Sequence, residues 1–291
     1  MANITASDLF NVNGMVFVVT GGGTGIGEMM AHALDVNGAA KVFILGRRLD
    51  KLQEVASSAK NKTIIPLQCD VASQDDLARA VDVVAAQTPF VNVVIANHGA
   101  TGPTLDQLPR EPRPSVAELR DYFWQTPMAA FTDTFQVNCS AVFYCFVAFL
   151  NLLDAGNTHA ASPAAALGID SQFVVTSSIN GFSRVPGMGY AYSASKAGVV
   201  HMAKLLATNM AGYHIRANVI APGIYPSAMS KHFLSRTEGQ VLPTIVPLER
   251  IGTGEDVAGV TLFLCSRAGA YLNGNVVVTD GGRLSILPGS Y

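Results

Sequence analysis

Charged residues are scarce in this chain of 291 residues, and they form no block of one sign. Asp, Glu, Lys and Arg together make up 14% of the sequence, and the formal net charge is -2. Nucleic acids and anionic membranes attract proteins through clustered Lys and Arg, so neither is expected as a partner. Apolar residues reach 49%. That share is too high for a disordered chain and predicts a large buried core or subunit interface.

Cysteine is also rare, and the four residues are Cys69, Cys139, Cys145 and Cys265. They form no Cys-x-x-Cys pair, and no cluster of Cys and His has zinc-site spacing, so we expect no metal. Their apolar surroundings favour reduced core cysteines in a cytoplasmic protein. The first ten residues lack a basic region followed by an apolar run, so we expect no signal peptide. The longest apolar run, 141–150, is too short to span a bilayer.

Short β-branched runs alternate with longer helical patterns along most of the chain. This alternation predicts an α/β fold with a parallel, doubly wound sheet. The predicted strands are 15–20, 41–45, 63–69, 91–96, 172–178, 216–221 and 275–279. The predicted helices are 25–37, 50–58 with Asp50 as N-cap, 73–87, 134–153, 191–211 and 255–267.

Two segments interrupt this rhythm. The segment 100–134 contains five prolines and Trp124, the only tryptophan, and we interpret it as an insertion with one short helix at 115–124. The segment 155–171 is rich in small residues and is predicted to be a loop. Because no repeat or linker-like tract is present, we expect one domain over residues 1–291.

A glycine-rich turn, Thr20-Gly21-Gly22-Gly23-Thr24-Gly25-Ile26-Gly27, follows the first predicted strand and opens a helix. Glycines let a backbone turn tightly and approach a pyrophosphate, and the free N–H groups at a helix start bind that anion. A glycine-rich run can also be only a flexible loop. Its position between a strand and a helix favours a dinucleotide site.

Tyr192 and Lys196 stand four residues apart in a predicted helix, which places both side chains on one face. An ammonium beside a phenol favours the phenolate, so we expect the pKa of Tyr192 to fall toward working pH. Such a group exchanges protons in carbonyl and alcohol chemistry. An isolated pair of this kind is more commonly an ordinary surface pair on a helix.

The order of motifs resembles the short-chain dehydrogenase/reductase family over residues 16–282. The matching segments are Thr20-Gly21, Gly25-Ile26-Gly27, Asp70-Val71, Asn97-His98-Gly99, Asn138, Ser178, Tyr192 with Lys196, Asn218, Pro222-Gly223 and Asp280-Gly281-Gly282. The resemblance implies a Rossmann-like, three-layer, doubly wound parallel sheet of about seven strands. One domain would then serve both a nicotinamide cofactor and a carbonyl substrate.

The family's four catalytic residue types are all present, as Asn138, Ser178, Tyr192 and Lys196. By resemblance, Tyr192 would protonate the developing alkoxide, Ser178 would orient the substrate oxygen and Asn138 would hold a water that connects Lys196 to solvent. The expected cofactor contacts are Gly21, Gly23, Thr24, Gly25, Ile26, Gly27, Arg47, Arg48, Asp70, Val71, Asn97, Gly99, Tyr192, Lys196, Pro222, Gly223, Ile224 and Ser227.

The end of the second strand bears on cofactor choice. An acidic side chain there would accept a hydrogen bond from the ribose 2′-hydroxyl of NAD, but the chain has Gly46 followed by Arg47 and Arg48. Arg47 can pair with a 2′-phosphate, so NADP(H) is the expected cofactor, with NAD(H) as the alternative. Both arginines could instead be solvated charges at a helix entry.

The remaining expectations concern the substrate and the assembly. The region 224–234 corresponds to a lid in the family, and Tyr225, Met229 and Phe233 would offer apolar contact to a bulky ketone. The apolar helix near 141–150 would pack against its copy in a homodimer or homotetramer. His98, where relatives most often have alanine, could carry a second proton, fill space or bond the backbone. Trp124 could line the pocket or belong to the core.

The leading hypothesis is an NADPH-dependent ketoreductase. The segment 141–156 and the insertion resemble fungal members acting on polyketides or other secondary metabolites, and the chain also resembles bacterial β-ketoacyl reductases. The alternatives are a scaffold for non-redox chemistry, such as cyclisation or epimerisation, an NAD-dependent alcohol dehydrogenase, and a cofactor-sensing protein without turnover.

Overall fold

Seven strands form one parallel sheet in the order β3-β2-β1-β4-β5-β6-β7. The computed structural model describes residues 4–108, 111–185, 187–230 and 241–290. The strands are β1 Val16–Thr20, β2 Lys41–Gly46, β3 Ile64–Gln68, β4 Val93–Ala96, β5 Gln172–Thr176, β6 Arg216–Pro222 and β7 Val276–Thr279. This confirms the predicted Rossmann-like sheet. The strand order reverses direction between β1 and β4, where doubly wound folds bind ligands.

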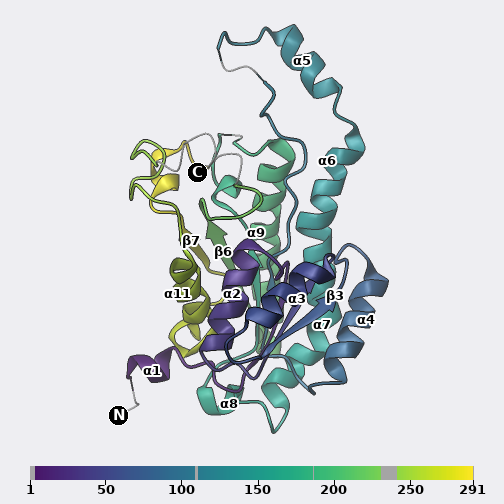
Figure 1. The fold of residues 1–291 in the computed structure, drawn as a ribbon, viewed down its shortest axis with the longest axis vertical. Coiled ribbons are helices and arrows are strands. Elements are labelled where there is room, and N and C mark those ends of the chain that lie inside the picture. The colour runs from purple at the N-terminus through teal and green to yellow at the C-terminus, as the bar shows by residue number, and fades with distance from the viewer. Residues whose placement is uncertain (1–3, 109–110, 186, 231–240, 291) are drawn as a thin grey trace.

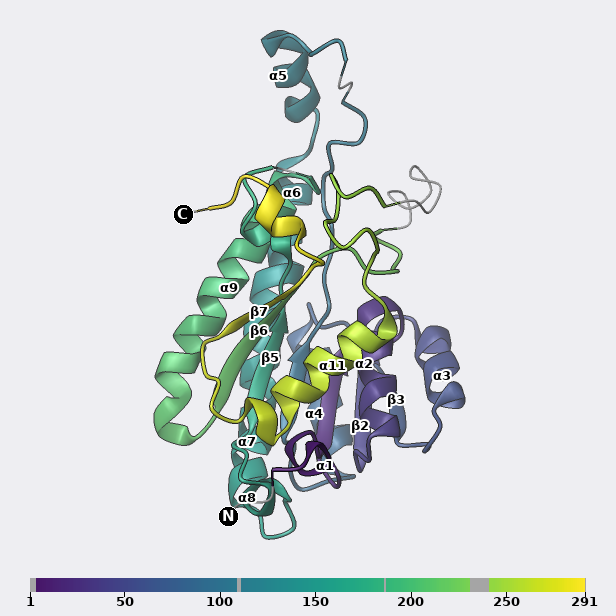
Figure 2. The same cartoon turned by 90° about the vertical axis from the view of Figure 1, so that its left-hand side faces the viewer.

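Helices cover both faces of the sheet (Figures 1 and 2). One face packs against α2 Gly25–Val36, α3 Leu49–Ser58 and α11 Gly254–Cys265, and the other against α4 Gln74–Ala85, α7 Ala141–Thr158 and α9 Tyr190–Met210. Every residue of Val16–Thr20 and Gln172–Thr176 is buried, as expected for strands covered on both faces. The remaining helices, α1 Ala6–Leu9, α5 Val116–Trp124, α6 Met128–Phe135 and α8 Ala164–Leu167, lie outside this frame.

The segment 100–134 rises beyond the carboxyl end of the sheet, with α5 at its tip (Figures 1 and 2). Ser115 caps α5 and forms a capping box with Glu118, as expected for a helix beginning there. The Tyr122 hydroxyl donates to the Thr104 carbonyl at 3.0 Å, and Phe123 contacts the Tyr190 ring edge-on. Trp124 is 77% exposed and stacks under Arg120, so it does not belong to the core.

Three sequence predictions at helix boundaries are wrong. Arg48, not Asp50, is the N-cap of α3, and Asp50 lies in its first turn. The helix predicted for 134–153 begins with α6 at Met128, passes through a π-helical turn at Gln136–Ser140 and ends at Thr158. The predicted loop 155–171 therefore contains the last turn of α7, and it also contains α8. Helical patterns mark the middle of a helix better than its ends.

The helical stretch Met128–Thr158 is apolar enough and long enough to cross a membrane, with a mean hydropathy of 1.6. A core helix passes the same test, and α7 buries Cys145, Phe146, Phe149 and Leu153 against the sheet. The opposite side of α7 is half exposed at Phe143, Tyr144 and Val147. This exposed side is the one that the predicted contact with another subunit would cover, and that contact stays a prediction.

Candidate active site

The glycine-rich turn connects β1 to α2 at the carboxyl edge of the sheet. Gly21 and Gly25 have φ values of 66° and 59°, which favour glycine. A Cβ on Gly27 would lie 2.3 Å from the Gly21 carbonyl oxygen, so this turn tolerates no side chain there. Thr24 is the N-cap of α2 but makes no side-chain cap hydrogen bond. A turn this tight, at a helix start with no side-chain cap, fits a pyrophosphate.

Residues that follow the neighbouring strands surround this turn. Arg47 and Arg48 follow β2, and both are exposed. Within the described ranges neither forms an ion pair. Asp70 and Val71 follow β3, where the Asp70 carboxylate accepts from the Ala72 N–H at 3.0 Å. The structure therefore brings these four predicted residues to the same edge as the glycine-rich turn.

Asn97 and Gly99 follow β4 and lie directly beside the turn. The Asn97 amide donates to the carbonyls of Thr20 and Gly21 at 3.3 and 3.4 Å. A Cβ on Gly99 would come within 3.4 Å of Lys196 Nζ. Asn97 thus supports the turn, and Gly99 leaves room for the lysine.

The segment after β6 reaches the turn from the other side. The Gly223 N–H donates to the Thr279 carbonyl, and the Gly252 N–H donates to the Ile224 carbonyl, both at 2.9 Å. Ser227 lies against Gly25, because a Cβ on that glycine would be 3.1 Å from Ser227 Cβ. Its hydroxyl is 3.2 Å from that of Ser230. Pro222 ends β6, so the segment begins at the carboxyl edge of the sheet.

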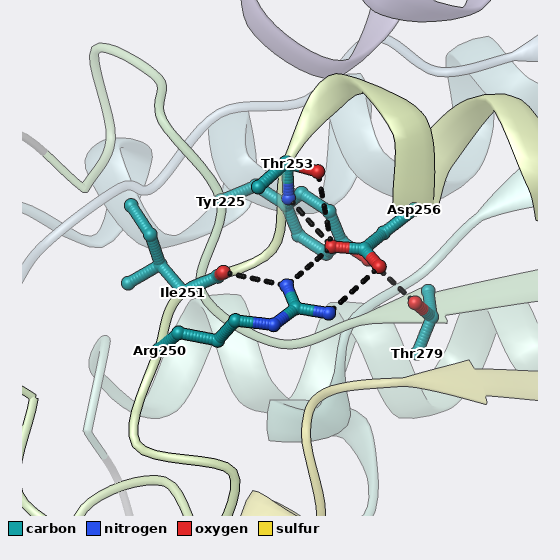
Figure 3. A network of polar contacts seen from close by, with 6 residues as sticks. All are labelled: Tyr225, Arg250, Ile251, Thr253, Asp256 and Thr279. Atoms are coloured by element: carbon teal, nitrogen blue, oxygen red, sulfur yellow. Dashed lines mark hydrogen bonds and ion pairs between the residues drawn. The ribbon is translucent and has the colours of Figure 1, made fainter.

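Tyr225 does not offer the apolar substrate contact expected from the sequence. Its side chain is buried, its ring packs against Gly252 and its hydroxyl bonds Thr279 (Figure 3). Beside it, Arg250 donates to both carboxylate oxygens of Asp256. The contacts with Gly252 and Thr279 hold Tyr225 at the start of the segment that follows β6. Met229 is partly exposed, and Phe233 lies outside the described residues.

The two hydroxyl groups of the predicted catalytic set meet at the end of β5. Ser178 lies two residues beyond this strand and caps a 3₁₀ turn by accepting from the Asn180 N–H. Tyr192 lies in the first turn of α9, and its phenol hydrogen-bonds the Ser178 hydroxyl. Both side chains are buried. A carbonyl oxygen can therefore be polarised by two adjacent hydroxyl groups.

Lys196 lies one turn further along α9. Its Nζ is 5.8 Å from the centre of the Tyr192 ring and donates to the Thr176 carbonyl at 2.8 Å. Burial lowers the pKa of Lys196 to about 8, and the Cys139 thiol acts in the opposite direction. The predicted same-face arrangement of Tyr192 and Lys196 is confirmed.

The expectation that the pKa of Tyr192 falls is wrong for this structure. Burial raises the pKa of the phenol, and the Ser178 hydrogen bond lowers it only in part. The reason is geometric: the Lys196 ammonium bonds a backbone carbonyl beneath the ring rather than the phenol oxygen. Desolvation of the phenolate then outweighs the opposing effect of the Ser178 hydrogen bond.

Asn138 lies in the π-helical turn before α7, and both the oxygen and the nitrogen of its amide make hydrogen bonds. Its Oδ1 accepts from the Ala100 N–H at 2.8 Å, and its Nδ2 donates to the Ala100 carbonyl and to Ser195 Oγ, both at 2.9 Å. π-helical turns are frequent at functional sites. The predicted role of Asn138 in holding a water near Lys196 stays a prediction.

Two contributors were missed in the sequence. Ser195 accepts from Asn138 and donates to the Tyr192 carbonyl at 2.8 Å, so it joins the π-helical turn to α9. The Thr176 carbonyl receives the lysine. Ser195 stands three residues after Tyr192, one helical turn away, and this spacing could have predicted that the two residues lie close together. A backbone acceptor such as Thr176 leaves no signal in a sequence.

His98 is buried, and its Nδ1 lies 2.6 Å from Thr20 Oγ1. Burial and, secondarily, the charge of Lys196 lower the pKa of His98 to about 3. A ring that remains neutral at physiological pH does not act as a second proton carrier. All four cysteines are free, and the described part of the chain contains no group of residues suited to a metal ion.

A dinucleotide turn beside a buried Ser, Tyr and Lys group on a Rossmann-like sheet defines the class of NAD(P)-dependent oxidoreductases. The family model described as enoyl-(acyl carrier protein) reductase matches residues 21–283. The chain belongs to the short-chain dehydrogenase/reductase family.

Individual relatives match almost the whole chain. "Short-chain dehydrogenase/reductase PhomF" of Diaporthe leptostromiformis is 46% identical over 99% of this chain and 98% of its own length. VdtF of Byssochlamys spectabilis, also named a short-chain dehydrogenase/reductase, is 41% identical over the same shares. Among solved structures, the Pseudomonas aeruginosa RhlG/NADP active-site complex has a TM-score of 0.77 at 27% identity, covering 95% of this chain and 99% of that one.

Proposed function

We propose that this protein is an NADPH-dependent ketoreductase that converts a bulky, largely apolar ketone to a secondary alcohol. The observation that carries the proposal is the hydrogen-bonded pair of Ser178 and Tyr192, with Lys196 beneath the tyrosine ring. This group lies at the same sheet edge as the glycine-rich turn. A carbonyl bound there would meet two hydroxyl donors beside a dinucleotide site.

The cofactor would be held by the turn 21–27, the start of α2 and the residues that follow β2, β3, β4 and β6. When bound, it would supply a hydride to the carbonyl carbon. Arg47 and Arg48 support NADPH because both are exposed and outside the described ion pairs. The NADP named in the RhlG complex supports the same choice.

The protein's own residues would manage the substrate oxygen and its proton. Ser178 would donate a hydrogen bond that orients the carbonyl, and Tyr192 would transfer its phenolic proton to the oxygen as the alkoxide forms. The raised pKa of Tyr192 keeps the phenol protonated for this task. Lys196 would stabilise the phenolate left behind. The π-helical turn that contains Asn138 would hold Ser195 and Gly99, the neighbours of Lys196, in place.

The substrate would enter over the carboxyl edge of the sheet, below α5. Large apolar side chains are exposed on α5 and α6, namely Phe123, Trp124, Met128 and Phe131. Such a surface suits an extended apolar molecule better than a small polar sugar. We also propose, from the resemblance described in the sequence analysis, a role in secondary metabolism and a single cytoplasmic domain.

The decisive experiment follows NADPH absorbance while a panel of ketones is offered to the purified protein. Consumption of NADPH with formation of one alcohol per cofactor oxidised supports the ketoreductase. Product formation without cofactor consumption would instead favour cyclisation or epimerisation. Cofactor binding without any turnover would favour a sensor.

The rate of ketone reduction should fall as pH rises through about 8. Burial lowers the pKa of Lys196 to about 8, so the ammonium is charged below this pH and neutral above it. The pKa of Tyr192 is raised, so the phenol stays protonated over the same range. A pH profile of kcat/KM from about pH 6 to 10 measures this. A flat profile across that range would contradict the assigned role of Lys196.

The protein should sediment as a homodimer or homotetramer, because Phe143, Tyr144 and Val147 on α7 are 41%, 43% and 45% exposed. Val147→Glu should yield monomers at micromolar concentration, since a carboxylate is costly to bury in an apolar interface. Val83→Glu, at a comparably exposed position on α4, is the matched control and should leave the assembly intact. A wild-type chain that sediments only as a monomer would contradict this proposal.

A further inference from the structure

His98 occupies a buried position between the cofactor turn and the proton-handling residues. It stands two residues after β4, and its side chain is 8% exposed. Its Nδ1 lies 2.6 Å from the hydroxyl oxygen of Thr20, the last residue of β1. The imidazole thus joins the ends of two neighbouring strands at the point from which the glycine-rich turn departs.

The surrounding hydrogen bonds determine which ring nitrogen carries the proton. Thr20 Oγ1 accepts from the backbone N–H of Asn97 at 3.1 Å and from that of His98 at 3.3 Å. Its own hydrogen is therefore available for His98 Nδ1, since the alternative acceptor, the Ile95 carbonyl, is 3.4 Å away. Nδ1 is then the acceptor and Nε2 bears the hydrogen. Nε2 is buried without a hydrogen-bond partner among the described residues.

The four residues 97–100 connect both halves of the site. At one end, the Asn97 amide donates to the carbonyls of Thr20 and Gly21. At the other end, Gly99 lies against Asn138 Oδ1 and Lys196 Nζ, and Ala100 exchanges two hydrogen bonds with the Asn138 amide. His98 is the member of this strip whose side chain bonds the Thr20 hydroxyl.

We propose that His98 is a positioning residue whose neutral ring, bonded to Thr20, sets the distance between the glycine-rich turn and the Asn138–Lys196 pair. The expected effect on catalysis rests on the proposed function, because His98 would act on the reaction through the bound cofactor and Lys196. The effect on cofactor affinity requires only that the turn binds the dinucleotide. Loss of the bond would leave the Thr20 hydroxyl without its short acceptor in a buried place and would loosen both ends of the strip.

Two variants with the same branched side-chain shape separate this bond from packing. In His98→Asn, the amide oxygen can stand near the position of Nδ1 and accept from Thr20, whereas His98→Leu removes the acceptor. Leucine fills more of the space of the ring than asparagine does, so packing alone would predict the smaller loss in His98→Leu. We expect His98→Leu to weaken NADPH binding about tenfold and to lower kcat as well. His98→Asn should remain within about threefold of wild type for both quantities.

Thr20→Val gives a second test that leaves the histidine in place. It should weaken NADPH binding at least as much as His98→Leu does, because the Thr20 hydroxyl also accepts from the N–H groups of Asn97 and His98. The double variant should be no worse than Thr20→Val alone. NADPH dissociation constants from fluorescence titration are the main readout, with melting temperature as a check that each variant folds. Equal losses in His98→Asn and His98→Leu, or additive losses in the double variant, would overturn the proposal. Because the titration needs no ketone, it decides the role of His98 even if the protein reduces none of the ketones offered.

Discussion

Replacing Tyr192 with phenylalanine should lower kcat for ketone reduction about a thousandfold while NADPH binds as before. The substitution removes only the phenolic oxygen, which is hydrogen-bonded to Ser178 and is the proposed proton donor. General acid catalysis contributes about 10²–10⁴-fold in rate, and water has poor access to this buried position to replace it. Steady-state kinetics and an NADPH titration of the same preparation measure the two quantities separately.

Tyr190→Phe is the matched control for this prediction. Tyr190 lies on the same helix two residues earlier, is 55% exposed and contacts Phe123 through its ring. The control removes the same atom type without touching Ser178 or Lys196, so it should retain nearly full activity. If Tyr192→Phe kept its activity, or if both variants lost it equally, Tyr192 could not be the proton donor.

The second large effect concerns cofactor choice. Arg47→Asp should shift the ratio of kcat/KM for NADPH over NADH toward NADH by about a hundredfold to a thousandfold. It removes a cation proposed to bind the 2′-phosphate and introduces a carboxylate that repels the phosphate and accepts from a 2′-hydroxyl. Gly46, at the end of β2, has no side chain that could bind a 2′-phosphate or accept from a 2′-hydroxyl.

The test for Arg47 needs a control with the same charge change elsewhere. Lys60 is exposed beyond the far end of α3, so Lys60→Asp alters the net charge equally and should leave the cofactor ratio unchanged. A wild-type preference for NADH, or an unchanged ratio in Arg47→Asp, would show that Arg47 does not recognise the phosphate.

The sheet and most of its helices could be predicted because their signals are local. Runs such as residues 16–19 are apolar at every position because both faces of a parallel sheet are covered. Ser73 and Ser115 mark helix starts through their own side-chain bonds. The pairing of Tyr192 with Lys196 required only helical spacing.

The errors arose where distant residues decide the outcome. The helix before α7 continues through a π-helical turn, and there Asn138 bonds Ala100 and Ser195, which lie 38 and 57 residues away. The sequence predicted that Tyr225 contacts a ligand, but in the structure its hydroxyl bonds Thr279 and its ring packs against Gly252. The pKa of Tyr192 depended on burial and on where the Lys196 ammonium points, and spacing along a helix specifies neither.

The amino-acid sequence by itself determined the parallel doubly wound sheet, the family and the residue types of the candidate site, because strand patterns, helix caps and glycine-rich turns act over a few neighbouring residues. Only the tertiary structure decided the protonation of the site: a neutral His98 bonded to Thr20, a Lys196 whose pKa is lowered to about 8 and a Tyr192 that stays protonated. The physical reason is that desolvation and long-range hydrogen bonds depend on which segments pack together, and that packing is a property of the whole folded chain.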